Sequence, residues 1–275
     1  TALVSRFPAV APLARFNMLD KRLGQMAHGN NAWLKLVGPD GRMHGRANTM
    51  GTVTFRFTHS NPNMGQVPSC RLPYGRECRS LFHVPVGSRL VGCDVSGLEL
   101  RILSHYLEPL DGGEFLAQVT DGDIHTRNME AAGLSSRDRA KTFIYALLYG
   151  AGDAKLGEIV APDLTSRDKL SKAGAALRRR FLSKTPALAT LTKSIQHKVS
   201  RFKTLKAIDG RTLEVRSAHS ALNTLIQSSG SIVVKAATVL FRRLLEAEGL
   251  CMGREWSLVV HVHDEHEETF TLEVW

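Results

Sequence analysis

The chain has 275 residues, of which 43% are hydrophobic and 23% charged, as is ordinary for a globular protein of one large or two smaller domains. Its 36 lysines and arginines outnumber its 26 aspartates and glutamates, and the net charge of +10 favours a polyanionic partner such as nucleic acid. No apolar run approaches ~18 residues, and no basic amphipathic helix carries interfacial aromatics, so no membrane partner is expected.

The cysteines indicate the cellular compartment, and the chain ends indicate whether the sequence is a fragment. The four cysteines form no C-x-x-C pair and no signal peptide is visible, which predicts a reduced, cytoplasmic chain. The chain starts at Thr1 rather than methionine and stops at Trp275 inside a predicted apolar strand. A fragment of a longer protein is therefore expected.

Taken in order, residues 1–45 are predicted to be mostly helical, with 11–32 as the best candidate helix, followed by a Gly-Pro-Asp-Gly turn. Residues 46–93 are rich in Gly, Pro, Thr and Val, and this composition predicts short strands and loops. Two strands are expected there, one at 52–55 and a buried one at 90–93.

Helices dominate the middle of the chain. Three leucines spaced by three and four residues mark a helix over 96–107, and 111–200 is mainly helical and carries most of the basic runs. An Asp-Gly-Arg turn precedes one or two long helices over 218–248. The chain ends in a predicted hairpin, with strands over 257–263 and 267–275. Strands therefore flank a helical insertion, and the predicted fold class is α+β.

The stretch from 121 to 152 carries one side chain every four residues: Arg137, Lys141, Tyr145 and Tyr149. On an α-helix this row drifts only about 120° over its length, so the side chains share one broad face, cationic at its start and aromatic at its end. A nucleoside triphosphate has the same polarity, from polyanion to flat base. Gly150 and Gly152 follow, and glycine ends a helix without the Cβ penalty of a left-handed cap. The alternative is an amphipathic helix with a solvated cationic face.

Two carboxylates are predicted at strand ends. Asp94 follows an apolar strand, and Asp264, with Glu265, occupies the turn of the C-terminal hairpin. Helix caps and hairpin turns use aspartate for backbone reasons alone, so each residue taken singly has a structural explanation. If adjacent strands bring Asp94 and Asp264 side by side, the pair suits two Mg²⁺ ions, and Arg137 and Lys141 suit the phosphates.

Three segments stand in an order and spacing that identify a family. GCDVSGLELRILSHYL resembles motif A of family A DNA polymerases, RDRAKTFIYALLYG resembles motif B (R-x3-K-x7-YG), and HVHDE resembles motif C. GDIHT and AKTFIY…LYGAG are most similar to the replicative polymerases of short-tailed bacteriophages. The resemblance covers about 19–270 and implies a template-directed DNA polymerase that adds dNTPs to primer–template DNA, in the host cytoplasm if the gene is a phage's.

The resemblance implies the ligands of two metal ions, Mg²⁺ with Mn²⁺ as an alternative. In the family the aspartates of motifs A and C bind both ions, and these correspond to Asp94 and Asp264. The backbone carbonyl of Val95 is a further implied ligand. Glu265 and Lys141 are implied to take part in catalysis.

The resemblance also implies a nucleotide pocket on the motif B helix. The implied contacts with the triphosphate and the templating base are Arg137, Lys141, His125 and Tyr149. Glu99 matches the steric gate against a ribose 2′-hydroxyl, since its carboxylate leaves no room for that group. Tyr145 stands where many bacterial members have phenylalanine, and it implies efficient use of dideoxynucleotides.

A second implied group reads the DNA duplex, namely Arg56, Asn223, Gln227 and His263. Every base pair shows an acceptor at its minor-groove edge, so donors placed there check pair geometry without reading sequence. The alternative is that the two amides cap local backbone and that Arg56 binds phosphate only. Further basic residues are expected to include phosphate contacts, with many of them simply solvated: Lys193, Lys198, Arg201, Lys203 and Lys206.

The family's right-hand architecture implies a thumb base at 1–45, a palm at 46–110 and 201–275, and inserted helical fingers at 111–200. By this resemblance, the sequence is expected to lack the exonuclease domain and most of the thumb, and to end within the palm. Weak DNA grip and low processivity are therefore expected of this chain alone. Whether another protein supplies proofreading or processivity stays open.

Two other functions compete with DNA synthesis. A single-subunit RNA polymerase shares the palm, but Glu99 and the R-x3-K spacing argue against it. A catalytically silent nucleic-acid-binding fragment belongs to a different class, and the truncated ends keep it open. Primer extension with aspartate variants separates these alternatives.

Overall fold

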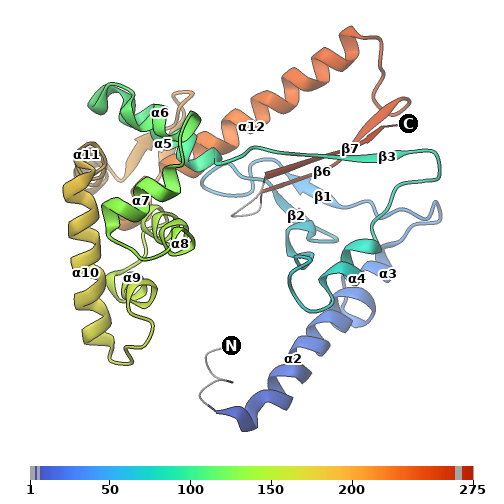
Figure 1. Ribbon diagram of the computed structural model, residues 1–275. Helices are drawn as coiled ribbons and strands as arrows, with labels where there is room; N and C mark the ends of the chain where they lie inside the picture. Colours follow the sequence, from blue (N-terminus) through green and yellow to red (C-terminus); the bar gives the residue numbers. More distant parts are fainter. Residues whose placement is uncertain (1–3, 5–6, 264–267, 275) are drawn as a thin grey trace. The chain divides into compact units, whose positions relative to one another are not determined.

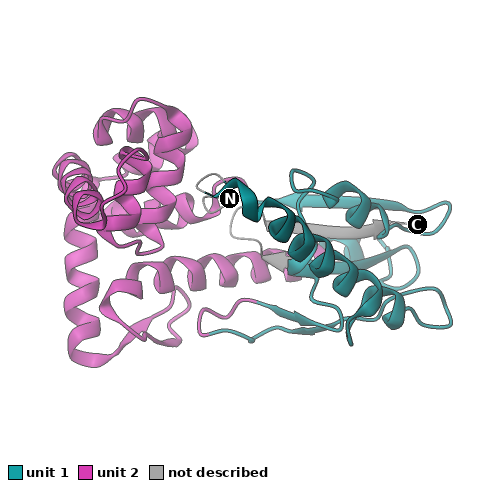
Figure 2. Cartoon of the chain, turned by 90° about the horizontal axis from the view of Figure 1, so that it is seen from below, with its two compact units in different colours: residues 1–52, 57–95, 242–275 teal, residues 53–56, 96–241 magenta. Residues whose placement is uncertain are grey.

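The computed structural model describes the chain except for residues 1–3, 5–6, 264–267 and 275. Helices and small antiparallel sheets make up a mixed α+β fold, as predicted (Figure 1). The chain divides into two compact units (Figure 2). Unit 1 consists of residues 1–52, 57–95 and 242–275, and unit 2 of residues 53–56 and 96–241.

Unit 1 begins with helices and short strands. In order they are η1 (Pro8–Val10), α2 (Ala11–Leu23), the π-helix η2 (Gly24–His28), α3 (Trp33–Leu36), β1 (Arg46–Asn48), β2 (Thr58–Ser60), η3 (Met64–Gln66) and α4 (Gly75–Ser80). The predicted helix over 11–32 is confirmed over 11–28 as α2 and η2, and it ends four residues earlier than predicted. Strands β1 and β2 pair antiparallel. Trp33 is buried and meets Phe82 edge-on, with 5.0 Å between ring centroids.

The main sheet of unit 1 contains β3 (Arg89–Asp94), β7 (Glu268–Val274) and β6 (Trp256–His263), in that spatial order. Both pairings are antiparallel, so β3 and β6 run in the same direction and end at the same edge. The backbone of Thr269 lies opposite Asp94 on one side and Val262 on the other. The predicted C-terminal hairpin is confirmed, and its turn lies outside the described residues.

Two predicted strands need correction. Residues 90–93 do form a strand, but β3 is an edge strand and all six of its residues are exposed, including Leu90 at 49%. An apolar run favours a strand through β-propensity, whereas burial depends on what covers the sheet. The strand at 52–55 is wrong, because these residues form a turn in which Phe55 has a φ of 61°, a value incompatible with a strand.

Unit 2 is mainly helical, as predicted for 111–200 and 218–248. Its elements are α5 (Leu98–Asp111), α6 (Glu114–Thr120), α7 (Ile124–Ala132), α8 (Arg137–Leu148), α9 (Asp153–Val160), α10 (Arg167–Lys184), α11 (Pro186–Phe202), β4 (Thr204–Lys206), β5 (Thr212–Glu214), η4 (Ala218–Ser220) and α12 (Ala221–Ala247), the last six residues of which belong to unit 1. Strands β4 and β5 form an unpredicted hairpin around the predicted turn at Gly210.

The core of unit 2 gathers around α8. Phe143 on α8 and Phe181 on α10 are fully buried and meet edge-on, with 5.1 Å between their ring centroids. Helices α9 and α10 approach so closely that a Cβ on Gly174 would lie 1.8 Å from the carbonyl oxygen of Asp153. A Cβ on Gly157 would likewise lie 2.0 Å from the carbonyl oxygen of Leu170. Glycine at both positions therefore permits the backbones to touch.

Helix α12 with the preceding turn is long and apolar enough to cross a membrane by length and composition alone, which the sequence prediction missed. Core helices of globular proteins have the same property. The buried positions of α12 run from Ala221 to Val234, so its first half contributes to the core. Burial therefore accounts for the apolar composition of the first half, whereas Val239, Leu240 and Leu244 in the second half are exposed.

Candidate functional site

Helix α8 presents the predicted cationic and aromatic face. Ser136 caps its start by accepting a hydrogen bond from the backbone N–H of Arg139 at 3.1 Å. Arg137 and Lys141 are exposed, and Tyr145 and Tyr149 are half-buried, with their ring centroids 6.2 Å apart. The opposite side is buried through Ala140, Phe143, Ile144, Leu147 and Leu148. The four-residue spacing thus predicted the exposed face and the packed face of this helix.

The end of α8 also follows the sequence in part. Tyr149 is the C-cap residue, and Gly150 follows with a φ of +74° in the left-handed region, as expected. Gly152 has an extended conformation instead and is the N-cap of α9, so its predicted role in ending α8 is wrong. Arg178 of α10 secures this connection by donating to the carboxylate of Asp153 at 2.8 Å and to the carbonyl of Ala151 at 2.6 Å.

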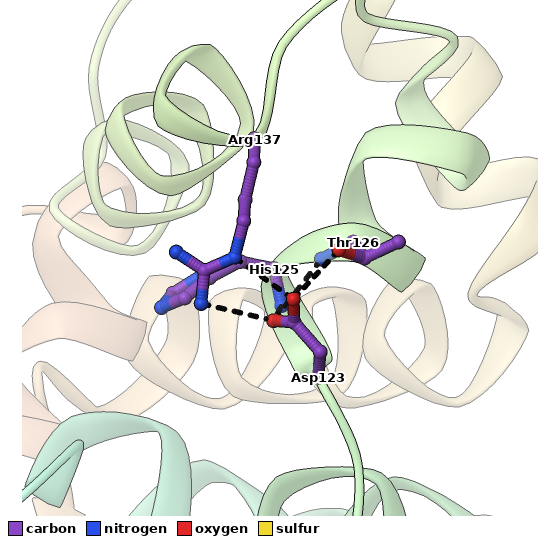
Figure 3. A network of polar contacts seen from close by, with 4 residues as sticks. All are labelled: Asp123, His125, Thr126 and Arg137. Carbon is purple, nitrogen blue, oxygen red and sulfur yellow. Dashed lines mark hydrogen bonds and ion pairs between the residues drawn. The ribbon is translucent and has the colours of Figure 1, made fainter.

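Asp123, which is not among the site residues predicted from the sequence, links the start of α7 to the start of α8 (Figure 3). Its carboxylate caps α7 by accepting hydrogen bonds from the backbone N–H groups of His125 and Thr126, at 3.1 and 3.4 Å. The Thr126 hydroxyl donates a third, at 2.7 Å. The same carboxylate accepts from Arg137 Nε at 2.8 Å and from Nη2 at 3.1 Å. The Asp-x-x-Thr pattern before a helix was the available signal.

Cationic groups surround His125. Burial lowers the pKa of its imidazole, and the positive charges of Arg137 and Lys141 lower it further. The Arg137 guanidinium, followed by the Thr126 hydroxyl, lowers the pKa of the Asp123 carboxyl, which is therefore ionised at neutral pH. The His125 ring centroid lies 6.4 Å from that of Tyr145. Arg137, Lys141 and His125 thus form one cluster suited to a polyanion, with Asp123 as its nearest carboxylate.

Glu99, in the first turn of α5, joins two other predicted residues. Its Oε1 accepts a hydrogen bond from the Tyr149 hydroxyl at 3.1 Å and lies 3.4 Å from Arg56 Nη2. The side chains of Arg56 and Glu99 are both 12% exposed. A pair so far removed from water holds its geometry through both contacts, because either charge alone would be costly to bury. The structure therefore brings Arg56, Glu99 and Tyr149 together.

The turn before Arg56 is secured by contacts that the sequence did not indicate. The carbonyl of Phe55 accepts hydrogen bonds from the Ser231 hydroxyl, at 2.8 Å, and from the Lys235 ammonium. The Arg211 guanidinium lies over the Phe55 ring, 4.5 Å from its centroid. A left-handed φ is strained for phenylalanine, and these contacts stabilise it. The only available signal was the four-residue spacing of polar Ser231 and Lys235 within an apolar helix.

Asn223 and Gln227 lie one turn apart on α12, on the same face. Both are half-buried, whereas Leu222, Thr224, Leu225 and Ile226 around them are buried. The Asn223 Oδ1 atom is buried and has no hydrogen-bond partner among the residues that the structure describes. A buried amide in this state is suited to a ligand or an ordered water.

The predicted metal ligands belong to unit 1. Asp94 is the last residue of β3 and is exposed, and Val95 follows it. Asp264 and Glu265 lie outside the described residues, and of His263 only the backbone is described, opposite Glu268. Asp94 was expected to follow a strand adjacent to the one that precedes Asp264. The strand beside β3 is β7, and β6 is one strand further away, so these two strands are not adjacent.

The fit of these residues to a metal ion is therefore partial. Strands β3 and β6 end at the same edge with only β7 between them, which brings Asp94 to the edge that β6 reaches just before Asp264. An exposed carboxylate and a backbone carbonyl are the hard oxygen donors that Mg²⁺ prefers. Within the part of the chain that is described, no group of three His, Cys, Asp or Glu side chains is placed to hold a metal.

Comparisons with known proteins show the family of the chain. The family model for DNA polymerase family A matches residues 3–268. The DNA-directed DNA polymerase of Escherichia phage T7 is 41% identical over 94% of this chain and 39% of its own length. That of Enterobacteria phage T3 is 40% identical with the same coverage. The thermostable DNA polymerase I of Thermus caldophilus is 32% identical over 84% of this chain and 28% of its own length.

A solved structure agrees in fold. The POL domain of Pol1 from M. smegmatis, in complex with DNA primer-template and dNTP, superposes with a TM-score of 0.70 at 22% identity. The match covers 88% of this chain and 43% of that one. The chain spans about two fifths of the length of the phage relatives that it matches.

Proposed function

The chain belongs to DNA polymerase family A, and on this premise we propose that it forms the polymerising part of a template-directed DNA polymerase. The reaction joins the α-phosphorus of a dNTP to the 3′ oxygen of a primer and releases pyrophosphate. The observation that carries the proposal is the row Arg137, Lys141, Tyr145 and Tyr149 on α8, with His125 close enough to interact with the charges of Arg137 and Lys141.

Three side chains are proposed to bind the triphosphate. Arg137 and Lys141 lie on the exposed face of α8, and His125 lies beside them at the start of α7. The lowered pKa of His125 leaves its imidazole neutral above pH 7, so it acts as a hydrogen-bond donor to phosphate. Lys141 stabilises the negative charge that develops on the leaving pyrophosphate, which gives it a catalytic role.

Glu99, Tyr149 and Tyr145 are proposed to shape the sugar and base end of the pocket. The hydrogen bond from Tyr149 to Glu99 fixes the carboxylate, and a fixed carboxylate excludes a ribose 2′-hydroxyl by its bulk. Arg56 contributes to the same constraint through its ion pair with Glu99. Tyr145, half-buried between His125 and Tyr149, places a phenol hydroxyl where it can replace a missing 3′-hydroxyl.

The carboxylates of Asp94 and Asp264 and the carbonyl of Val95 are proposed to hold two divalent cations, Mg²⁺ or Mn²⁺. When bound, such a pair activates the attacking hydroxyl and stabilises the leaving oxygen. Asp94 fits this role as an exposed carboxylate at a strand end. Glu265, next to Asp264 in sequence, is proposed to assist catalysis.

The DNA duplex is proposed to contact Arg56, Asn223, Gln227 and His263. Asn223 and Gln227 share one face of α12, at the half-buried positions of a buried stretch. Such amides suit the acceptors that every base pair presents in its minor groove. The right-hand division into a thumb base (1–45), a palm (46–110 and 201–275) and fingers (111–200) remains part of the proposal, as does a cytoplasmic location.

Primer extension tests the proposal. With a labelled primer–template, dNTPs and Mg²⁺, the chain is expected to lengthen the primer. Asp94→Asn and Asp264→Asn are expected to lose at least about 10²-fold in rate, because each removes a charge that serves the transition state. Faster extension with NTPs than with dNTPs would identify an RNA polymerase instead. DNA binding without extension would identify a silent binding fragment.

A further inference from the structure

Asp123 is the most firmly held carboxylate in the cationic cluster of unit 2. Five donors converge on it, three from the start of α7 and two from Arg137 (Figure 3). The contacts with His125 and Thr126 fix the carboxylate relative to the helix that carries His125. The pairing with Arg137 then fixes a guanidinium on a second helix. One carboxylate thus sets the positions of two proposed phosphate ligands.

The pairing occupies only one edge of the guanidinium. Arginine carries five N–H donors in a rigid planar fork, and Asp123 accepts one from Nε and one from Nη2. Within the described part of the chain, the remaining three N–H groups, two on Nη1 and one on Nη2, have no protein partner. The Arg137 side chain is 53% exposed, so this second edge is accessible. Two parallel N–H groups on such an edge suit a phosphate.

We propose that Asp123 is a positioning residue for the triphosphate, holding the Nε–Nη2 edge of Arg137 so that the Nη1–Nη2 edge is ready to bind the terminal phosphates. The inference rests on the proposed function and adds a residue to that site. A long exposed arginine side chain otherwise samples many rotamers, and fixing it in advance lowers the entropy lost on binding. Asp123 also aligns His125 with this edge by capping α7.

The negative charge of Asp123 and its positioning of Arg137 have opposite effects on triphosphate affinity. The direction in which affinity changes when Asp123 is neutralised therefore tests the inference. Asp123 is an anion close to a site for a polyanion, so its charge alone repels the ligand. If charge were its only contribution, neutralising Asp123 would tighten triphosphate binding. If Asp123 acts by positioning, neutralising it loosens binding despite the more positive site.

The measurement is the affinity of dATP with Mg²⁺ for the chain bound to a dideoxy-terminated primer–template. Asp123→Asn keeps a good N-cap for α7, because asparagine caps as well as aspartate, and removes the charge that holds Arg137. We expect its affinity to fall on the order of tenfold, the range of coupling within one hydrogen-bonded network. Arg137→Lys keeps the charge but loses the fork, and the same direction of change is expected.

Two further variants decide how Asp123 acts. In an Arg137→Ala background, Asp123→Asn is expected to cause no additional loss, since it acts through Arg137. Asp138→Asn is the matched control, because it removes a negative charge next to Arg137 with no contact to it. That control is expected to bind dATP as well as the wild type or slightly better. The melting temperature of Asp123→Asn should stay within a few degrees of the wild type, because an exposed ion pair contributes little to stability.

Contrary results are distinguishable from failure of the proposed function. If the wild type binds no dATP on primer–template, the proposed function fails. If the wild type binds dATP but Asp123→Asn binds it equally or more tightly, the positioning role is overturned while the polymerase stands. An equal loss with and without Arg137 would also overturn it.

Discussion

Tyr145 is the residue whose chemistry says most about which nucleotides the proposed pocket would accept. Its hydroxyl lies on a half-buried ring between His125 and Tyr149, and burial raises the pKa of the phenol, so it is protonated. Tyr145→Phe removes that hydroxyl and little else. We expect the variant to discriminate against dideoxynucleotides more strongly than the wild type, by on the order of 10²- to 10³-fold if the hydroxyl substitutes for the missing 3′-hydroxyl. A terminator competition assay measures this, and equal discrimination by both proteins would refute it.

His125 predicts a pH dependence with a definite sign. Burial and the charges of Arg137 and Lys141 hold the pKa of its imidazole below the ordinary value of 6.5, so folding favours the neutral ring. A bound triphosphate favours the charged ring and raises that pKa, so binding takes up a proton. Triphosphate affinity is therefore expected to rise a few-fold as pH falls from 7.5 towards 5.5. Without ligand, the same shift makes stability fall as pH drops below about 6.5.

The comparison that isolates this effect is His125→Gln, because the phosphates titrate in the same range in both proteins. The wild type is expected to gain affinity on acidification relative to the variant. Parallel pH profiles for the two proteins would show that His125 does not contact the triphosphate.

For individual residues, the sequence predicted which side chains share a helix face better than it predicted contacts between residues on different elements. The four-residue row on α8 was read correctly because helical periodicity alone fixes which side chains share a face. Asp123 was missed because its partner Arg137 lies on a different helix, and no local pattern records that pairing. The Lys235 and Ser231 contacts with Phe55 were missed for the same reason, since they cross 180 and 176 residues of sequence.

Between elements, the seam of α9 and α10 is expected to be the least tolerant of added volume. A methyl group on Gly174 would meet the backbone of Asp153 at 1.8 Å, and backbone does not move aside as a flexible side chain does. Gly174→Ala gains about 1 kcal/mol in helix propensity. Overpacking typically costs about 1–3 kcal/mol, and the upper end applies where backbone must shift, so after the propensity gain we expect a net destabilisation of about 2 kcal/mol.

Urea unfolding measures this difference in the free energy of unfolding. Gly24→Ala serves as the control, because Gly24 has a helical φ of −60° and no atom within 4 Å of an added Cβ. That control is expected to match or exceed the wild type in stability. A Gly174→Ala protein as stable as the control would mean that the two helices separate at little cost.

The positions of most helices and strands were predictable from the sequence, but their burial and tertiary contacts were not. Long periodic segments such as α12 and the β6–β7 hairpin were predicted nearly to their ends. The strand at 52–55 failed because tertiary contacts hold Phe55 in a left-handed conformation that local β-propensity argues against. Strand β3 was predicted in place but wrongly buried, because an apolar sequence does not state whether anything covers it.

For the molecule as a whole, the net charge of +10 predicts that DNA binding depends on salt. Each phosphate neutralised releases counterions, so affinity is expected to fall about tenfold between 50 and 200 mM salt for every two phosphates contacted. Lys193→Ala, at an exposed position on α11, should lower the salt slope by about one if Lys193 contacts phosphate. Fluorescence anisotropy with a labelled primer–template measures the slope. A slope near zero would contradict an electrostatic interface.

The α+β class followed from strands that flank a helical insertion, and the family followed from three motifs in order. The division into units did not follow. Residues 53–56 belong with the helical unit although they lie far from it in sequence, and their long-range contacts, such as Ser231 with Phe55 and Glu99 with Arg56, are consistent with that assignment. The proposed metal ligands Asp94 and Asp264 were selected by residue type and position after a strand, and Asp264 lies outside the described residues.

The pairing of β3 with a strand from a distant part of the sequence has a consequence for synthesis on the ribosome. Strand β3 has β7 as its neighbour in the sheet, and almost all of unit 2 is translated between the two. Apart from 53–56, unit 2 is one continuous stretch, so it is complete in the emerging chain before the main sheet of unit 1 exists. Stalled nascent chains of increasing length should therefore resist protease first across 96–241. Until β7 is translated, Leu90 and Val91 of β3 lack their partner strand and can bind a chaperone. Simultaneous protection of both units would disprove this order.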